Sequence, residues 1–229
     1  MTYDILLFDA DRTLFDFDAS EKAAFTKVAP EFGIKPTDEV YLTYKRFNDE
    51  NWEMLERGEL EKPRILVRRF EQILNYCGLD ISRAGQLDAK YLKTLARESI
   101  IFPESVEVLT ELKKRGKRLF LITNGVTEVQ KGRLSRSPLK DFFEEVFISD
   151  EIGFEKPSPE FFKAVENGVK DFDKQKSIVI GDSLTSDIKG ANISGISCVW
   201  LNAKNTELPK GYKADYIITE LKQVLDIIK

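Results

Sequence analysis

Six short apolar runs, separated by helix and turn signals, place the strongest constraint on how this chain can fold. They lie at residues 5–8, 119–122, 146–148, 178–180, 198–201 and 216–218. The runs are continuously apolar rather than alternating, which is typical of strands buried on both faces of a parallel sheet. Helix patterns fall between them, so the sequence predicts an α/β fold with a Rossmann-like, doubly wound parallel sheet.

Two of the intervening stretches show clear helix signals. The pattern from Pro103 has Glu early and Lys late, and it stops at Gly116, as the helix dipole and C-cap preferences require. The pattern from Ser158 opens with a serine N-cap and places Pro159 at the first helical position. Both stretches are therefore expected to form helices of the α/β core.

Residues 16–99 interrupt the alternation of strands and helices. This segment has no convincing strand pattern, and its aromatic residues recur at helical spacing, as at Tyr41, Tyr44 and Phe47. Gly and Pro interruptions near residues 33–36, 58, 62–63 and 78 divide it into about four helices. We therefore predict an α/β core domain of residues 1–15 and 100–229, with residues 16–99 inserted as a helical cap domain.

The absence of histidine restricts the chemistry that is open to this chain. It excludes Ser-His-Asp triads, Cys-His pairs, histidine phosphotransfer and nearly all zinc hydrolase sites. Any catalysis must rest on carboxylates, lysine and hydroxyl groups, with or without a hard metal ion.

Charge and cysteine usage narrow the range of partners. The formal net charge is −4 and the charges are interspersed, so no basic surface indicates a nucleic acid polymer or an anionic membrane. Cys77 and Cys198 form no CxxC pair, which favours a reducing compartment, and no stretch approaches the roughly 20 apolar residues of a membrane-spanning helix. We expect a cytoplasmic protein, a monomer or weak dimer, with a small-molecule partner.

Polar side chains follow three of the apolar runs, at the point where each strand would end. They are Asp9 and Asp11 after the first run, Thr123, Asn124 and Gly125 after the second, and Asp182 and Asp187 after the fourth. The carboxyl ends of parallel strands share one edge of the sheet, and ligands bind there at the switch point of the strand order. These clusters are therefore expected to converge on one site.

The carboxylates of this site call for a cation. Asp9 and Asp11 are two residues apart at the end of a buried strand, and we expect the backbone to bend directly after that strand so that both reach one ligand. Repulsion between several carboxylates favours a bound cation, and oxygen ligands without His or Cys favour Mg²⁺. Lys156 is the natural positive partner for a bound anion, and donors from residues 123–125 could complete a phosphate cradle.

Four sequence motifs carry a resemblance to a known family. DADRT, LITNG, EKPSPEFF and GDSLTSD resemble, in order and separation, the motifs of the haloacid dehalogenase-like phosphatases. The resemblance covers residues 1–15 and about 100–229, and the insertion is similar to the helical cap of one large branch of that superfamily. Arg12 departs from the pattern, because the superfamily more often has Gly, Asn, Asp or Glu there, and its role is left open.

The resemblance implies a phosphoaspartyl mechanism. Asp9 would attack phosphorus, and Asp11 would protonate the leaving oxygen and then activate the hydrolytic water. The presence of an acid at Asp11 favours a phosphatase over a dehalogenase. The same resemblance implies Mg²⁺ bound by the Asp9 carboxylate, the backbone carbonyl of Asp11 and Asp182, with Asp187 orienting metal waters or Lys156, and phosphoryl oxygens bound by Thr123 and Lys156.

A narrower resemblance, to the bacterial pyrimidine 5′-nucleotidases, extends into the cap. It rests on DADRTLFDFD, the Asn48–Trp52 element, Arg69-Phe70 and Trp200-Leu201-Asn202. It implies UMP, dUMP and dTMP as substrates, with Asn48, Trp52 and Arg69 as binding residues.

Other functions stay open alongside a nucleotidase. They are a sugar-phosphate or phosphoglycolate phosphatase, a phosphomutase, a phosphorylatable signalling module similar to response-regulator receivers, and a binding or scaffold protein on the same fold.

Overall fold

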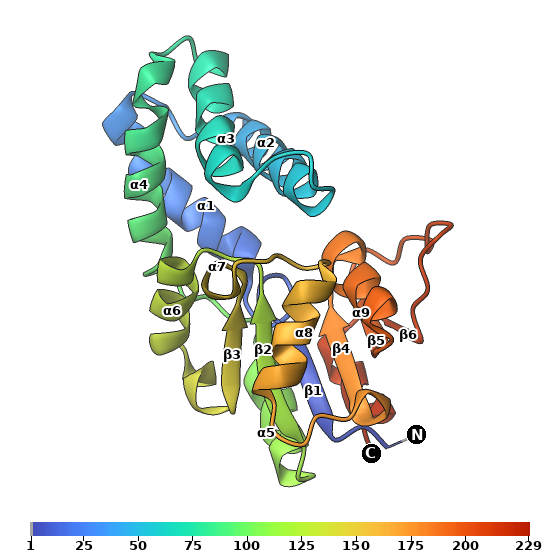
Figure 1. Cartoon of the computed structure of the whole chain (residues 1–229). Helices are drawn as coiled ribbons and strands as arrows, with labels where there is room; N and C mark the ends of the chain where they lie inside the picture. Colours follow the sequence, from blue (N-terminus) through green and yellow to red (C-terminus); the bar gives the residue numbers. More distant parts are fainter. Residues whose placement is uncertain (1) are drawn as a thin grey trace.

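A six-stranded parallel sheet forms the core of the computed structural model, and a lobe of helices lies above the carboxyl ends of its strands (Figure 1). The structure describes residues 2–229. The strands are β1 (Ile5–Asp9), β2 (Arg118–Thr123), β3 (Glu145–Ile148), β4 (Ser177–Gly181), β5 (Ser197–Leu201) and β6 (Tyr216–Ile218). Their order is β3-β2-β1-β4-β5-β6, and every neighbouring pair is parallel. The predicted α/β fold is confirmed, with a strand at each of the six apolar runs.

Helices cover both faces of the sheet, which explains why its strands are apolar without alternation. On β1, Leu6 and Phe8 pack on one side with α5 and α10, whereas Ile5 and Leu7 pack on the other side with α8 and α9. All four of these side chains are buried. The core helices are α5 (Ser105–Lys114), α6 (Thr127–Ser135), α7 (Ser149–Ile152), α8 (Pro159–Gly168), α9 (Lys189–Ser194) and α10 (Val224–Ile227).

The two helices with clear sequence signals differ in how well their starts were predicted. The hydroxyl of Ser158 accepts from the backbone N–H of Phe161, so α8 has the expected N-cap. Helix α5 begins at Ser105, two residues after the predicted start at Pro103. The reason is a turn, in which the N–H of Ser105 donates to the carbonyl of Phe102 at 3.1 Å and its hydroxyl donates to Leu14 at 2.8 Å.

Four helices form the cap, in agreement with the predicted helical insertion. They are α1 (Phe17–Val28), α2 (Asp38–Glu56), α3 (Lys62–Tyr76) and α4 (Ala84–Leu95). Stacked aromatic rings fill the centre of the cap, with ring centroids 4.4 Å apart for Phe25 and Tyr44 and 5.3 Å apart for Tyr44 and Phe70. The chain enters and leaves the cap through two adjacent linkers, which pair through a bridge between Phe15 and Ile101.

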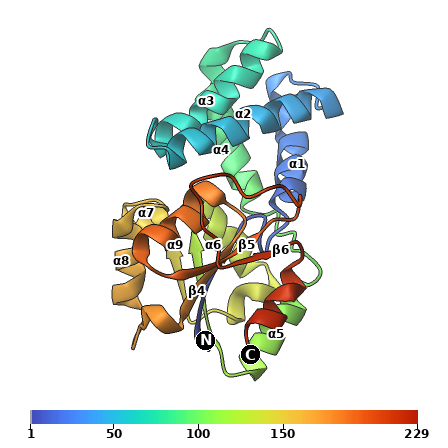
Figure 2. The same ribbon diagram turned by 90° about the vertical axis from the view of Figure 1, so that its right-hand side faces the viewer.

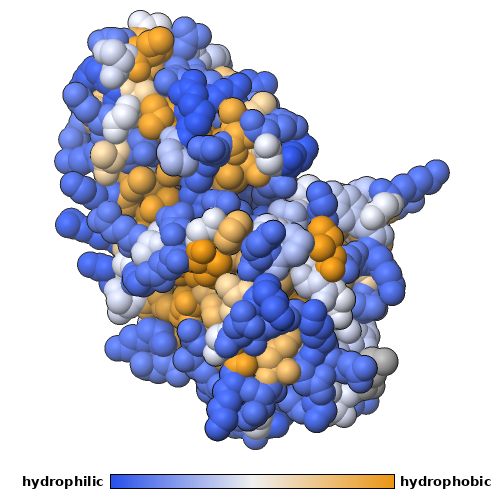
Figure 3. Space-filling model, viewed as in Figure 1, coloured by the Kyte–Doolittle hydropathy of each residue, from blue (hydrophilic) through white to orange (hydrophobic). Residues whose placement is uncertain are grey.

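The cap and the core form two lobes with a notch between them on the right-hand side of the view (Figure 3). The C-terminus lies at the end of the core that is far from the cap (Figure 2). Between residues 2 and 229, the helices are all too short or too polar to cross a membrane.

Candidate active site

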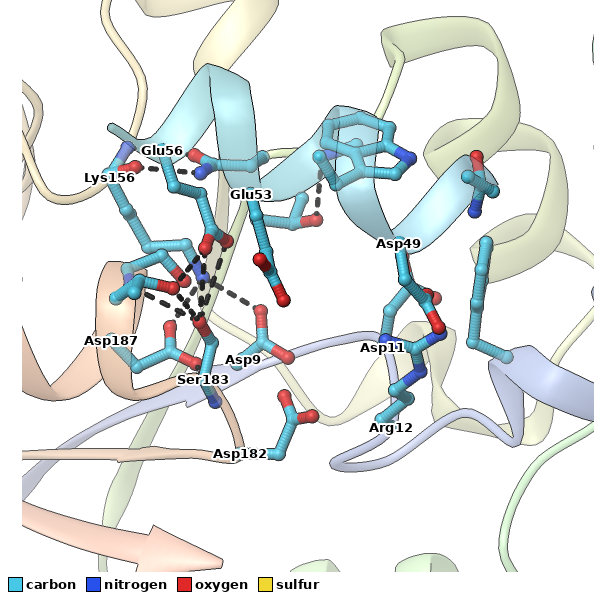
Figure 4. A pocket seen from close by; sticks show the side chains of 18 of the residues that line it. Asp9, Asp11, Arg12, Asp49, Glu53, Glu56, Lys156, Asp182, Ser183 and Asp187 are labelled. Carbon is cyan, nitrogen blue, oxygen red and sulfur yellow. Dashed lines mark hydrogen bonds and ion pairs between the residues drawn. The ribbon is translucent and has the colours of Figure 1, made fainter. Parts of the chain in front are cut away.

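A cavity of about 630 Å³ lies between the cap and the carboxyl edge of the sheet (Figure 4). Three neighbouring strands supply polar residues to it: Asp9 ends β1, Thr123 ends β2 and Asp182 follows β4. The strand order reverses between β1 and β4, so the cavity occupies the switch point where α/β sheets bind ligands.

The backbone turns sharply directly after β1, as expected. The N–H groups of Leu14 and Phe15 both donate to the carbonyl of Ala10, at 3.0 and 2.9 Å. Arg12 lies within this turn at φ 62°, in the left-handed region that few non-glycine residues adopt. The turn allows Asp9 and Asp11 to line the same cavity.

Lys156 is a buried cation held between two carboxylates. Its Nζ donates to Asp9 and to Asp187, each at 2.7 Å, and to the carbonyl of Ile122 at 3.0 Å. The side chain is only 1% exposed. Burial acts to lower the pKa of Lys156, but the two carboxylates outweigh burial and raise the pKa, so the ammonium group stays charged.

Negative charge exceeds positive charge around Lys156. The pKa of Asp9 is raised to about 7, chiefly by burial, with Lys156 opposing the rise and Asp187 adding to it. The pKa of Asp182 is raised well above its ordinary value by burial and then by Asp9 and Asp187. Carboxylate oxygens of Asp9, Asp182 and Asp187 lie within 4.8 Å of one another. Because these ligands are all oxygens, the cluster suits a hard divalent cation such as Mg²⁺.

The position of Asp187 depends on a glycine at the end of β4. A Cβ at Gly181 would lie 2.2 Å from Oδ2 of Asp187, so a larger residue would displace the carboxylate. The N–H of Ser183 donates to the same oxygen at 3.2 Å. Asp187 itself lies in a π-helical turn, Leu184–Ile188, whose N-cap is Ser183. The GDSLTSD motif is therefore a compact support for the carboxylate cluster.

The carboxylate of Asp11 lies away from this cluster, against α6. Its Oδ2 accepts from Nε2 of Gln130 at 2.6 Å, and its Oδ1 forms an ion pair with Nη1 of Arg133. Gln130 also donates to the hydroxyl of Thr123 at 3.1 Å. A Cβ at Gly125 would lie 2.0 Å from Nε2 of Gln130, so this glycine makes room for the Gln130 side chain. The expected metal contact through the Asp11 backbone carbonyl stays a prediction.

The loop after β2 fixes the backbone of Lys156. The side-chain amide of Asn124 accepts from the N–H of Lys156 at 2.7 Å and donates to its carbonyl at 2.8 Å. The N–H of Gly125 donates to the hydroxyl of Thr123 at 3.1 Å. Thr123, Asn124 and Gly125 thus form hydrogen bonds within the protein, and their expected contacts with phosphate stay predictions.

The three cap residues expected to bind substrate all line the cavity. Trp52 is half-buried there, whereas Asn48 and Arg69 belong to a buried network. Arg69 donates to Asn48 at 2.7 Å and to Asp88 at 3.0 Å, and Asn48 donates to Glu21 at 2.7 Å. The polar groups of Asn48 and Arg69 are therefore bonded within the cap, and their role toward substrate stays a prediction.

Arg12 connects the turn after β1 to the cap. Its Nε donates to Asp18 on α1 at 2.9 Å, and its Nη2 donates to Asp49 on α2 at 2.6 Å. Lys45 donates to the same two carboxylates, at 3.0 and 3.1 Å. The residue that departs from the family motif is thus part of a four-residue ion cluster between the core and the cap.

A second contact between cap and core involves Glu56, at the end of α2. Its carboxylate accepts from the hydroxyl of Ser183 at 3.4 Å and from that of Thr185. Burial raises the pKa of Glu56, and Asp187 also raises it. Together with Glu53, one turn earlier on the helix, Glu56 gives the cap an acidic wall that faces the carboxylates of the core (Figure 4).

Comparison with known proteins places the chain in a family. Residues 3–195 match the model of the haloacid dehalogenase-like hydrolases. The chain is 32% identical to the pyrimidine 5′-nucleotidase PynA of Streptococcus pneumoniae, over 100% of this chain and 96% of PynA. It is 27% identical to the pyrimidine 5′-nucleotidase YjjG of Escherichia coli, over 100% of this chain and 99% of YjjG.

A solved structure gives the same answer. The crystal structure of YfnB from Bacillus subtilis, bound to magnesium, superimposes with a TM-score of 0.95 at 30% identity and covers 100% of both chains. The chain therefore belongs to the haloacid dehalogenase-like hydrolases, which confirms the resemblance seen in its motifs. Within that family it is a phosphoric monoester hydrolase.

Proposed function

We propose that this protein is a Mg²⁺-dependent phosphatase that hydrolyses nucleoside 5′-monophosphates such as UMP, dUMP and dTMP through a phosphoaspartyl intermediate. The observation that carries the proposal is the placement of Asp9. Its carboxylate is held at 2.7 Å by the buried cation Lys156, at the base of a cavity that the cap covers, and a second carboxylate follows two residues later.

The chemistry proceeds in two steps. In the first, an oxygen of Asp9 forms a bond to phosphorus, the ester P–O bond breaks, and Asp11 gives its proton to the leaving oxygen. In the second, water attacks phosphorus, Asp11 takes the proton of that water, and the bond to Asp9 breaks to release inorganic phosphate. Lys156 and the Thr123 hydroxyl would neutralise and orient the phosphoryl oxygens, which is the main demand of phosphoryl transfer.

Asp9, Asp182 and Asp187 fit a magnesium ion, since their oxygens lie within 4.8 Å of one another and the buried carboxylates repel each other without a cation. When bound, Mg²⁺ would supply positive charge next to the transferring phosphoryl group. The magnesium-bound structure of YfnB, which is similar to this chain over its full length, supports the assignment.

We expect Mg²⁺ to stabilise the fold more at about pH 8 than at about pH 5, because protons and metal compete for the same carboxylates. The folded state raises the pKa of Asp9 from 3.8 to about 7. The protonated form thus stabilises the metal-free fold fully below pH 3.8, and this contribution is lost as the pH rises through about 7. Saturating Mg²⁺ should raise Tm by roughly 5 to 10 °C at the higher pH.

Thermal unfolding with EDTA or Mg²⁺ at the two pH values measures this difference. Asp182→Asn should remove most of the rise that Mg²⁺ produces at the higher pH, whereas Asp141→Asn, an exposed site on the core, should leave it unchanged. An equal rise in Tm at both pH values would contradict the assignment of these carboxylates as the metal ligands.

The walls of the cavity favour a leaving group that is uncharged. Trp52, Phe17 and Leu92 offer apolar and aromatic surface to a nucleoside, whereas Glu53 and Glu56 place negative charge above the site. Such a wall repels the carboxylate of phosphoglycolate but not a neutral nucleoside. The names of PynA and YjjG, both pyrimidine 5′-nucleotidases, agree with this choice.

A phosphate-release screen tests the substrate assignment. Wild-type protein with Mg²⁺ should hydrolyse UMP, dUMP and dTMP with kcat/KM well above that for phosphoglycolate and sugar phosphates. Glu53→Gln should raise kcat/KM for phosphoglycolate by about tenfold, as expected from one partly screened charge, with little change for dTMP. Glu128→Gln, on the exposed side of α6, is the control. Faster turnover of phosphoglycolate than of every nucleotide would overturn the nucleotide assignment.

A further inference from the structure

Arg133, on α6, is a fully buried arginine that takes no part in the two proposed chemical steps. Its side chain is 0% exposed, and within residues 2–229 its one ion-pair partner is Asp11. An unpaired charge in such a position would strongly destabilise the protein, so the ion pair with Asp11 is a fixed part of the fold. Arg133 thus binds directly to the carboxylate that is proposed to move the protons.

The same arginine contacts both linkers between the core and the cap. Its guanidinium lies over the ring of Phe15 in the first linker, at 4.6 Å from the centroid, and near the ring of Phe17 at the start of α1, at 5.6 Å. Its Nε donates to the carbonyl of Glu98 at 3.2 Å, and its own carbonyl accepts from the hydroxyl of Ser99 at 2.7 Å, both in the second linker. The Arg133 side chain therefore connects Asp11 to both linkers between the core and the cap.

Gln130 completes the hold on Asp11 but does not reach the linkers. It donates to the second carboxylate oxygen of Asp11 at 2.6 Å and to the hydroxyl of Thr123 at 3.1 Å, so its contacts lie inside the site. Of the two residues of α6 that hold Asp11, only Arg133 can therefore relate the position of this carboxylate to the arrangement of the cap linkers.

We propose that Arg133 is a positioning residue that couples the cap linkers to Asp11, so that the proton-transferring carboxylate is correctly placed only when the linkers adopt the arrangement seen here. This inference rests on the proposed function, because it takes Asp11 as the acid and base of the reaction. Arg133 contacts no reacting atom in this account. It acts through the orientation of Asp11.

If Arg133 no longer positions Asp11, the rate should fall selectively for esters with poor leaving groups. Protonation of the leaving oxygen matters greatly for an alkyl ester, whose alkoxide is a poor leaving group, and little for a nitrophenyl ester, whose phenolate leaves without a proton. A misplaced Asp11 should therefore slow the first step for benzyl phosphate and leave it nearly unchanged for nitrophenyl phosphate. A general loss of folded protein would lower both rates by the same factor.

The experiment compares kcat/KM for these two esters, which reports the steps up to formation of the phosphoaspartate. Arg133→Met should lower kcat/KM for benzyl phosphate by about a hundredfold and that for nitrophenyl phosphate by less than about threefold. Arg136→Met is the matched control, since Arg136 is the C-cap residue of the same helix but is exposed and donates to the carbonyl of Gly132. It should resemble wild type on both esters.

Two further variants keep the test decisive. Asp11→Asn should show the same ester-selective loss, and adding Arg133→Met to it should cause no additional loss, because Arg133 acts only through Asp11. Arg133→Lys, which keeps the charge but not the planar fork, should show a smaller loss of the same selectivity and serves if the Met variant does not fold.

The outcomes separate this inference from the proposed function. Equal losses on both esters in the Arg133 variants, or none, with a selective loss in Asp11→Asn, would overturn the role of Arg133 alone. A lack of any selective loss in Asp11→Asn would instead overturn Asp11 as the acid of the proposed mechanism, and the coupling with it.

Discussion

Asp9→Asn should lower kcat at least about a thousandfold, because an amide oxygen cannot form the phosphoaspartate on which both steps depend. The fold should survive the change. Asn has nearly the same shape as Asp, and Lys156 keeps its second carboxylate partner, Asp187, at 2.7 Å. Phosphate release and thermal unfolding, measured on the same preparation, check the two halves of this expectation.

The loss of activity in Asp9→Asn is interpreted against a control substitution at an exposed position. Asp141→Asn makes the same chemical substitution at an exposed position of the core and should keep wild-type activity. If Asp9→Asn retained half of the wild-type rate, Asp9 would not be the nucleophile, and the two-step chemistry would have to be abandoned.

Lys156→Met should destabilise the metal-free protein by about 3 to 5 kcal/mol, the usual effect of removing one partner of a buried ion pair. Lys156 is the cation that contacts both Asp9 and Asp187, at 2.7 Å each, and its loss leaves two buried carboxylates facing each other. Mg²⁺ should restore part of the stability by supplying positive charge, but not the activity, since the phosphoryl oxygens lose their ammonium partner. Urea unfolding with and without Mg²⁺ measures the difference.

Lys163→Met is the appropriate comparison for stability. Lys163 is an exposed residue of α8 whose ion pair with Glu166 spans 3.2 Å, and its removal should cost less than about 1 kcal/mol. A Lys156→Met protein as stable as wild type in metal-free buffer would mean that Asp9 and Asp187 do not need this cation.

The core of the fold could be predicted because burial on both faces leaves a simple pattern in the sequence. Most positions in the middle of the strands are buried and apolar, and each of the six runs was visible for that reason. Helix α6 was not predicted, because its three buried residues are Val129, Gln130 and Arg133. Two of these three side chains are polar, which removes the apolar periodicity of a helix. The partners of Asp11 were missed with it.

The site shows the same division between local and tertiary information. Asp9, Thr123 and Asp182 could be located because they terminate strands, and the ends of parallel strands must meet. The contact of Glu56 with Ser183 joins residues 127 positions apart and has no local signal. Likewise, no spacing within the cap distinguishes Asn48, which is bonded in a buried network, from Trp52, which is half-buried at the cavity.

The most direct test of the account is the mass of the protein during turnover. Acid quenching of the wild-type enzyme within the first turnover of dTMP with Mg²⁺ should reveal protein heavier by one phosphoryl group, and peptide mapping should place that group on Asp9. The adduct should be absent from Asp9→Asn and should decay as inorganic phosphate appears. Rapid release of phosphate from dTMP with no adduct at any quench time, or with the adduct on another residue, would contradict the central claim.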